Sequence, residues 1–258
     1  MFRVNKYCWA LVALLTSMFG AFAQTNNETS PSDTSPETSV TRAQQPTPEQ
    51  LGDALMLHQR YQAAIETYKR CPNGSAIVLN KLGIAYQMLF NTEEAMKYYK
   101  ASLHIDPNNE HVLNNLGTVY DSLRQYVAAE RMYRKALKIN PKSALIQRNL
   151  GTNLLAQRKY SKGWEAYQTA LAIDPDVFEH DTHLRIGNPA STQDRGAINY
   201  YMAKSYAHAG MKDRAIEYLR VALNEGFTTP KKLNADSEFA SLRGIPAYQQ
   251  LLADQGTP

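Results

Sequence analysis

The sequence lacks the short motifs that identify most catalytic and cofactor-binding sites. It contains no G-x-S-x-G nucleophile elbow, no G-x-x-x-x-G-K-[ST] phosphate loop, no G-x-G-x-x-G dinucleotide fingerprint and no H-E-x-x-H zinc motif. Its 6 histidines are scattered along the chain. We therefore expect no enzymatic activity, no catalytic residue and no cofactor.

The chain also lacks a strong charge of either sign. It has 28 Lys and Arg against 24 Asp and Glu, which gives a formal net charge of +4. No cluster of basic residues along the sequence is dense enough to suggest nucleic-acid binding. We therefore expect no nucleic-acid partner.

Long hydrophobic runs are missing as well. The apolar run at residues 8–19 is shorter than the ~20 residues that a membrane-spanning helix needs. It follows Arg3 and Lys6 and precedes Ala21-Phe22-Ala23, which is the pattern of a signal peptide cleaved after Ala23. We expect an exported protein, periplasmic or extracellular, that is not inserted in a membrane after cleavage.

Cysteine is scarce, and disulfides are not expected within the mature chain. The chain has 2 cysteines, Cys8 and Cys71, and cleavage of the signal peptide would remove Cys8. Cys71 would then have no partner in the same chain, and we expect it to be a buried free thiol. Residues 24–44, rich in Ser, Thr and Pro, are expected to be a disordered linker, either a tether or a passive segment.

The chain does contain one pattern that occurs three times at a constant spacing of 34 residues, as from Leu82 to Leu116 to Leu150. Apolar residues within 76–89 and 92–105 recur at steps of three and four, which predicts two helices. Asn91, with Glu94 after it, should cap the second helix, and Asp106-Pro107 should end it. One hairpin cannot bury both apolar stripes, so neighbouring hairpins must stack. The positions that keep the spacing include Leu82-Gly83, Leu116-Gly117 and Leu150-Gly151; Tyr99, Tyr133 and Tyr167; and Pro107, Pro141 and Pro175.

This pattern resembles the tetratricopeptide repeat, which has the same period. The chain departs from the family where Leu79, Leu113 and Gln147 replace a tryptophan and where Leu154 replaces a tyrosine. The resemblance implies an all-α fold, a right-handed α-solenoid of helix-turn-helix repeats. It also implies the function of a non-catalytic scaffold or adaptor that binds a protein or peptide partner.

The register of the repeats divides the chain into four parts. We expect a signal peptide at 1–23, a linker at 24–44, the solenoid at 45–225 and a C-terminal helical cap at 226–258. The cap is similar to the terminal module of many bacterial proteins of this family, through Leu233, Asp236, Leu242 and Arg243. About five repeats are expected, at residues 45–71, 76–109, 110–143, 144–175 and 196–225, with an insertion at about 177–195.

The resemblance also implies a site. In this family the first helices of the repeats line a concave groove that holds an extended peptide or partner segment. Side-chain amides suit the backbone of such a peptide because they donate and accept hydrogen bonds. Replacing Asn115 and Asn149 together by alanine should weaken partner binding and leave folding intact. The residues that the resemblance places in the groove are Asn80, Ile84, Asn114, Asn115, Arg148, Asn149, Tyr200 and Lys204.

Other interpretations stay open. The first helices could instead form a carboxylate clamp, which needs Lys, Arg and Asn side chains on adjacent repeats. Asn114 and Arg148 match this arrangement in part, but Asn80 and Leu145 occupy two positions where it needs other residues. The chain could instead be a homo-oligomeric structural or assembly protein of the cell envelope. The insertion at 177–195 could bind a metal or ligand, although such short loops are usually solvated and no metal site is expected. Its candidate ligands are Asp174, Asp176, Glu179, His180, Asp181 and His183.

Overall fold

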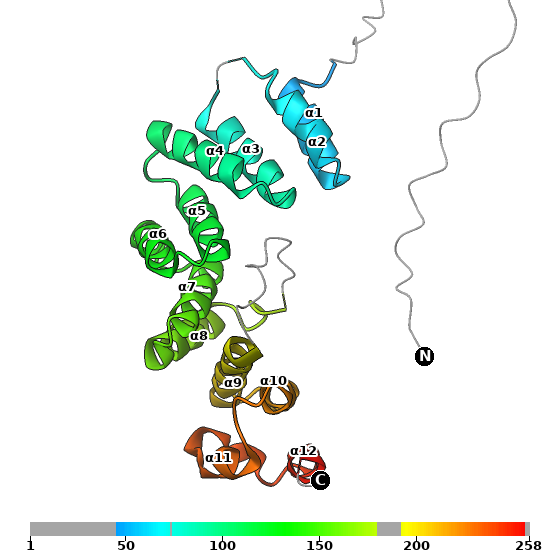
Figure 1. The fold of residues 1–258 in the computed structure, drawn as a ribbon, viewed down its shortest axis with the longest axis vertical. Helices are drawn as coiled ribbons and strands as arrows, with labels where there is room; N and C mark the ends of the chain where they lie inside the picture. Colours follow the sequence, from blue (N-terminus) through cyan, green and yellow to red (C-terminus); the bar gives the residue numbers. More distant parts are fainter. Residues whose placement is uncertain (1–44, 73, 180–191, 256–258) are drawn as a thin grey trace, which may run out of the picture. The chain divides into compact units, whose positions relative to one another are not determined.

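The computed structural model describes residues 45–72, 74–179 and 192–255 (Figure 1). The predicted signal peptide, the predicted linker and most of the predicted insertion lie outside these residues. The described residues form twelve α-helices and one 3₁₀-helix, with no strand. The predicted all-α fold, a solenoid of helix-turn-helix repeats, is confirmed.

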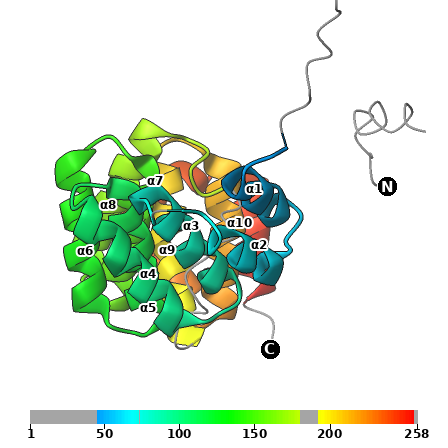
Figure 2. The ribbon, with the colours of Figure 1, turned by 90° about the horizontal axis from the view of Figure 1, so that it is seen from above.

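Ten of the helices form five consecutive antiparallel pairs, and each second helix contacts the first helix of the next pair. Figures 1 and 2 both show pairs that follow one another in sequence as neighbours in space. The pairs are α1 (Pro48–Leu57) with α2 (Tyr61–Tyr68), α3 (Ala76–Met88) with α4 (Thr92–Ile105), α5 (Glu110–Ser122) with α6 (Tyr126–Ile139), α7 (Ala144–Ala156) with α8 (Tyr160–Ile173), and α9 (Thr192–His208) with α10 (Lys212–Asn224).

Local sequence sets where these helices begin. The Asn91 side chain accepts a hydrogen bond from the Glu94 backbone at the start of α4, as predicted, but the Asn91 backbone N–H bonds to the carbonyl of Tyr86 and not to the Glu94 side chain, so the capping box is not completed. Asn109 and Ser143 cap α5 and α7 in the same way. At α1 the structure adds a reciprocal capping box, in which Thr47 and Gln50 bond to each other's backbone.

The core of each middle repeat is a tyrosine of the second helix packed on a glycine of the first. Tyr99 and Tyr133 are fully buried. A Cβ atom added at Gly83 would lie 2.5 Å from a ring carbon of Tyr99, and one at Gly117 would lie 2.5 Å from a ring carbon of Tyr133. The recurring glycine is therefore needed because two helices approach each other closely at this point.

The turn inside each pair contains a residue in the left-handed region. Gln59, Phe90, Arg124 and Arg158 have φ of 57°, 57°, 58° and 59°, and Gly210 has 78° at the corresponding place in the fifth pair. The backbone N–H of Asn91 donates to the carbonyl of Tyr86 at 3.0 Å, which closes the end of α3 as in a Schellman motif. These five turns thus share one conformation, although only the fifth pair uses glycine.

The break between the fourth and fifth pairs is filled by the start of the insertion. Phe178 is buried, and its ring lies 4.8 Å from that of Tyr167 on α8 and 5.7 Å from that of Tyr206 on α9. The guanidinium of Arg214 on α10 donates to Asp176, the residue just before the insertion, at 2.8 Å. The beginning of the insertion therefore holds α8 and α9 together.

After α10 the chain forms three short helices: α11 (Pro230–Ala235), the 3₁₀-helix η1 (Ser237–Leu242) and α12 (Pro246–Asp254). The side chains of Phe239, Leu242 and Tyr248 are buried in one core with α9 and α10. At the other end, Cys71 has a free thiol and is only partly buried, which differs from the expected full burial. None of the helices in the described ranges is long and apolar enough to cross a membrane.

Candidate functional site

The predicted binding residues all lie on the first helices α3, α5, α7 and α9. We call the side of these helices that carries them the first-helix face. They come from separate repeats, and the stacking of the pairs brings them together. The structure shows the four asparagines bonded across the junction between one repeat and the next.

The four asparagines form two such bonds. The Asn115 amide donates to the Oδ1 of Asn80 at 3.3 Å, and the Asn149 amide donates to the Oδ1 of Asn114 at 2.9 Å. The side chains of Asn114, Asn115 and Asn149 are buried, with 6%, 8% and 5% of their surface exposed. The amides therefore join α3 to α5 and α5 to α7.

Arg148 extends the second of these bonds to the start of the insertion. Its guanidinium donates to the backbone carbonyl of Val177 at 2.8 Å and to the Oδ1 of Asn149 at 3.5 Å. Ile84 is partly buried and packs against the apolar cluster of α4 and α5. A carboxylate clamp would need the Arg148 guanidinium for a ligand, and here it already bonds within the chain.

Tyr200 and Lys204 contact the C-terminal module. Both donate to the same carboxylate oxygen of Asp236, Lys204 at a distance of 3.0 Å. Partial burial opposes ionisation of Asp236, but these bonds and one from the Glu238 backbone lower the pKa of its carboxyl. The ammonium of Lys204 also lies 4.7 Å from the centre of the Trp164 ring.

At the other end of the face, Lys81 joins α3 to α1. Its ammonium donates to Glu49 and to Asp53, both at 2.7 Å. Between α3 and α5, the Gln87 amide donates to Thr118 at 3.0 Å. Lys81, Gln87 and Thr118 thus continue the row of bonds between neighbouring first helices.

A second set of polar groups lies beneath the face, against the core tyrosines. The hydroxyl of Tyr99 donates to Gln87, and that of Tyr133 donates to Asp121, both at 2.7 Å. Asn153 on α7 also donates to Asp121, which is 4% exposed. Burial raises the pKa of the Asp121 carboxyl to about 6, although these two hydrogen bonds oppose the shift.

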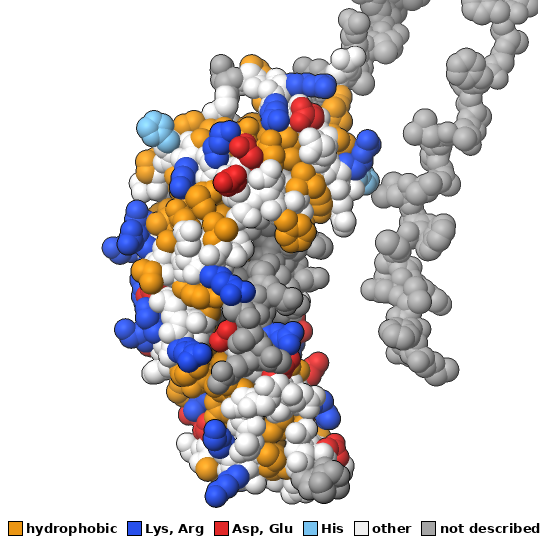
Figure 3. All heavy atoms as spheres, viewed as in Figure 1, with side chains coloured by type: hydrophobic (Ala, Val, Ile, Leu, Met, Phe, Trp, Pro, Cys, Tyr) orange, Lys and Arg blue, Asp and Glu red, His pale blue; other side chains and the backbone are white. Residues whose placement is uncertain are grey.

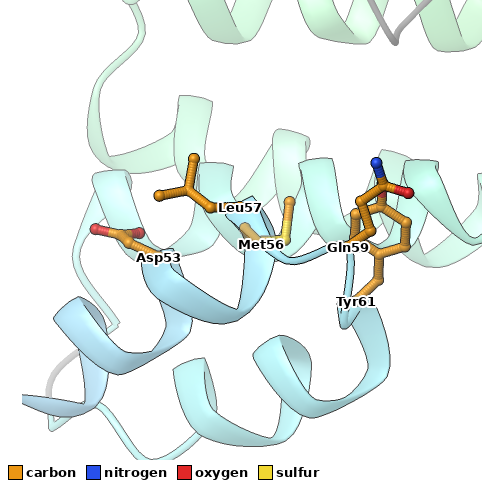
Figure 4. Close-up of a pocket in the computed structure, with 5 residues that line it drawn as sticks. All are labelled: Asp53, Met56, Leu57, Gln59 and Tyr61. Atoms are coloured by element: carbon orange, nitrogen blue, oxygen red, sulfur yellow. The ribbon is translucent and has the colours of Figure 1, made fainter. Parts of the chain in front are cut away.

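A pocket adjoins the face at its first repeat. It has a volume of about 430 Å³ and is lined by Asp53, Met56, Leu57, Gln59 and Tyr61 (Figure 4). Asp53 is shared with the bond to Lys81, whereas the Leu57 side chain is 85% exposed. The pocket therefore combines a partly neutralised carboxylate with exposed apolar surface.

Three family models for the tetratricopeptide repeat match the chain, at residues 75–142, 114–177 and 198–225. Together they span half of the chain, and the matched segments coincide with the helix pairs from α3 to α10. The chain belongs to the tetratricopeptide repeat family.

Solved structures share this repeat architecture. PilF of Pseudomonas aeruginosa is 18% identical, with 81% of this chain and 87% of that chain covered and a TM-score of 0.53. MamA is 20% identical, with 71% and 97% covered and a TM-score of 0.49. At these identities the likeness to PilF concerns the fold alone. No curated protein matches the chain in sequence.

The tetratricopeptide repeat protein thus uses its groove positions in a way that sequence reasoning did not foresee. Gln87, Thr118 and Asp121 are groove positions by the register of the repeat, yet they bond to the core or to each other. The signal was available in part, because Gln87 and Asp121 occupy equivalent repeat positions and each precedes a core tyrosine by the same interval. No group of residues suited to hold a metal ion is found among the described residues.

The burial of the asparagines changes what their removal should do. Replacing Asn115 or Asn149 by alanine leaves the partner oxygen without its donor, and we expect each change to lower the free energy of unfolding by about 1–3 kcal/mol. Chemical denaturation followed by circular dichroism measures this. Asn234→Ala, at an exposed site on α11, is the control and should leave the midpoint unchanged. An equally unchanged midpoint for Asn115→Ala and Asn149→Ala would show that the amides are not structural.

Proposed function

We propose that this protein is a non-catalytic interaction scaffold, and that a peptide or partner segment docks on its first-helix face. The repeat family fits such a role. The observation that carries the proposal is the continuity of the face: bonds between neighbouring first helices join α1, α3, α5 and α7 into one polar surface. A surface held in this way is preorganised, so a partner loses less free energy in ordering it.

The partner would meet the more exposed members of the face. The imidazole of His111 is 77% exposed, and it precedes Asn115 by one turn of α5. Asn80 and Ile84 are partly exposed on α3, in the repeat that follows the one with the pocket. The buried amides of Asn114, Asn115 and Asn149 would then act mainly by keeping these groups in place.

We further propose that the protein works outside the cytoplasm, as the pattern of residues 1–23 indicates. N-terminal sequencing of the protein recovered from envelope and secreted fractions tests this step. A mature N-terminus at Gln24 is expected, and an intact Met1 in those fractions would contradict it.

The docking surface is tested by pull-down from the same fractions, with the full chain as bait. The double change Asn80→Ala with His111→Ala should reduce capture of a partner at least tenfold, because both side chains lie where the segment would run. Its circular dichroism spectrum at the temperature of the pull-down should stay that of the wild type, although Asn115 loses its acceptor and the midpoint of denaturation should fall as in Asn115→Ala.

Glu165→Ala is the matched control, since Glu165 is exposed on the second helix α8. Capture that persists in Asn80→Ala/His111→Ala and disappears in Glu165→Ala would place the binding surface on the second helices instead.

A further inference from the structure

The charge of this protein is strongly segregated, although its net value is small. Between Asp121 and Glu165 the chain has ten basic residues and a single acidic one, Glu130. The remainder of the chain is therefore net acidic, since the whole carries only +4. The basic segment includes α6 and its flanking turns.

Five of these cations follow one side of α6 and the turn after it. They recur at steps of one, three and four, so those on the helix project from the same side. All five side chains are exposed. Figure 3 shows Lys and Arg side chains gathered at the left edge of the molecule, where α6 lies in Figure 1. We call this set the α6 strip: Arg131, Arg134, Lys135, Lys138 and Lys142.

The acidic residue nearby does not neutralise the strip. Glu130 accepts from Arg134 and from Lys159, both at 2.8 Å, so a single carboxylate is shared by two cations. Partial burial opposes ionisation of Glu130, but these bonds and one from Gln157 lower the pKa of its carboxyl to about 2. Among the described residues, Arg131, Lys135, Lys138 and Lys142 form no salt bridge.

The repeats supply an internal comparison, because each position of the third repeat has a counterpart in the fourth. On α8 and after it, the positions of the five strip cations are taken by Glu165, Gln168, Thr169, Ala172 and Asp176. None of these is basic, yet α8 packs in its repeat as α6 does. The fold therefore does not require cations at these positions.

Exposed aliphatic side chains accompany the strip. Val127 lies one turn before Arg131 and is 66% exposed, and Ile139 follows Lys138 and is 41% exposed. The inner side of α6 packs on α5 and α7, and the strip lies on the exposed outer side. A flat layer of anionic groups can meet all five cations and both aliphatic side chains at once.

We propose that the α6 strip docks the protein on an anionic lipid surface. Clustered Lys and Arg side chains are attracted to phosphate headgroups near such a surface. Val127 and Ile139 would enter the headgroup region, where aliphatic groups gain from leaving water. Inserting aliphatic side chains between base pairs requires the duplex to unstack, whereas a headgroup layer admits them without that cost, which favours a lipid layer. This surface lies on a second helix and is independent of the proposed docking on the first-helix face.

Co-sedimentation of the full chain with vesicles tests the proposal. Vesicles of phosphatidylcholine with about one third phosphatidylglycerol should bind the wild type at least tenfold more tightly than vesicles of phosphatidylcholine alone. Binding should fall steeply as salt rises, because exposed charges are screened within ~10 Å at 0.1 M. The apolar run at residues 8–19 and the basic Arg3 and Lys6 before it are present in every variant, so any binding that they cause is common to the wild type and the charge variants.

The variant Lys135→Glu with Lys138→Glu should lose about tenfold or more of this preference. Lys231→Glu with Lys232→Glu makes the same change of charge at two exposed lysines of α11 and should retain most of it. An equal loss of the preference for anionic vesicles in both variants would show that net charge alone attracts the protein, and would overturn the proposed role of the α6 strip. Equal binding of the wild type to both kinds of vesicle, or displacement from vesicles by stoichiometric duplex DNA, would overturn the lipid partner.

Discussion

Tyr133→Ala is expected to lower the free energy of unfolding by about 3–5 kcal/mol, the range for removing a large buried aromatic side chain. Tyr133 is fully buried and lies in a cluster with Leu113, Ile146 and Leu150, so the cavity would open at the junction of α5, α6 and α7. Guanidinium denaturation followed by circular dichroism measures the loss. Because a solenoid gains stability from each junction, the variant should also unfold less cooperatively.

Tyr133→Phe is the matched control for this change. It keeps the ring and removes only the hydroxyl that donates to Asp121. We expect a loss of about 1.5–3 kcal/mol, since the acceptor is a carboxylate. Equal losses for the two variants would mean that the hydroxyl, not the packing of the ring, accounts for the stability of this repeat.

Asp121 should make the protein less stable as the pH rises from about 4 to about 6. Burial raises the pKa of this carboxyl to about 6 from its ordinary value of 3.8. In that window the unfolded chain has released the proton and the folded chain still holds it, so folding is favoured at low pH and the benefit is lost as pH rises. The difference corresponds to about 3 kcal/mol, as an order of magnitude.

The variant Asp121→Asn isolates this contribution, because it keeps the size of the side chain and does not titrate. The stability of the wild type relative to the variant should fall by about 3 kcal/mol between pH 4 and pH 7. Other groups act in the opposite direction: the lowered pKa of Glu130 gives stability that is present above pH 4.5 and is lost as the pH falls towards 2. The comparison removes such groups, since both proteins contain them.

Denaturation curves at pH 4, 5, 6 and 7 measure the effect. Glu165→Gln, which replaces an exposed carboxylate on α8, should track the wild type at every pH. Parallel stability curves for Asp121→Asn and the wild type would show that the buried carboxyl does not titrate in this range.

The helices of this protein were predictable because their signals are local. The caps at Asn91, Asn109 and Ser143 and the stop before Pro107 act within one turn of the backbone, so each can be read from a few neighbouring residues. The constant spacing of the repeats then identifies Gly83 and Tyr99 as partners in a close helix contact. The capping box of Thr47 and Gln50 was readable by the same rules and was missed.

The state of the candidate site was not predictable in the same way. The register places Asn114 and Asn149 at groove positions, and it says nothing about whether their amides face solvent or each other. That depends on the distance between α5 and α7, and both of these helices also pack on α6. The contact of Tyr200 and Lys204 with Asp236 likewise depends on where the C-terminal module folds back.

By itself, the sequence determined that this chain stacks helical hairpins, because helical periodicity, capping and the small-to-large pairing of glycine with tyrosine are properties of short segments. Only the tertiary structure decided which polar side chains join the repeats and which stay exposed. It also decided that the cations of residues 131–142 form one exposed strip along α6, which a net charge of +4 conceals. The physical reason is that exposure and the sharing of a charge depend on neighbours that are distant in the chain.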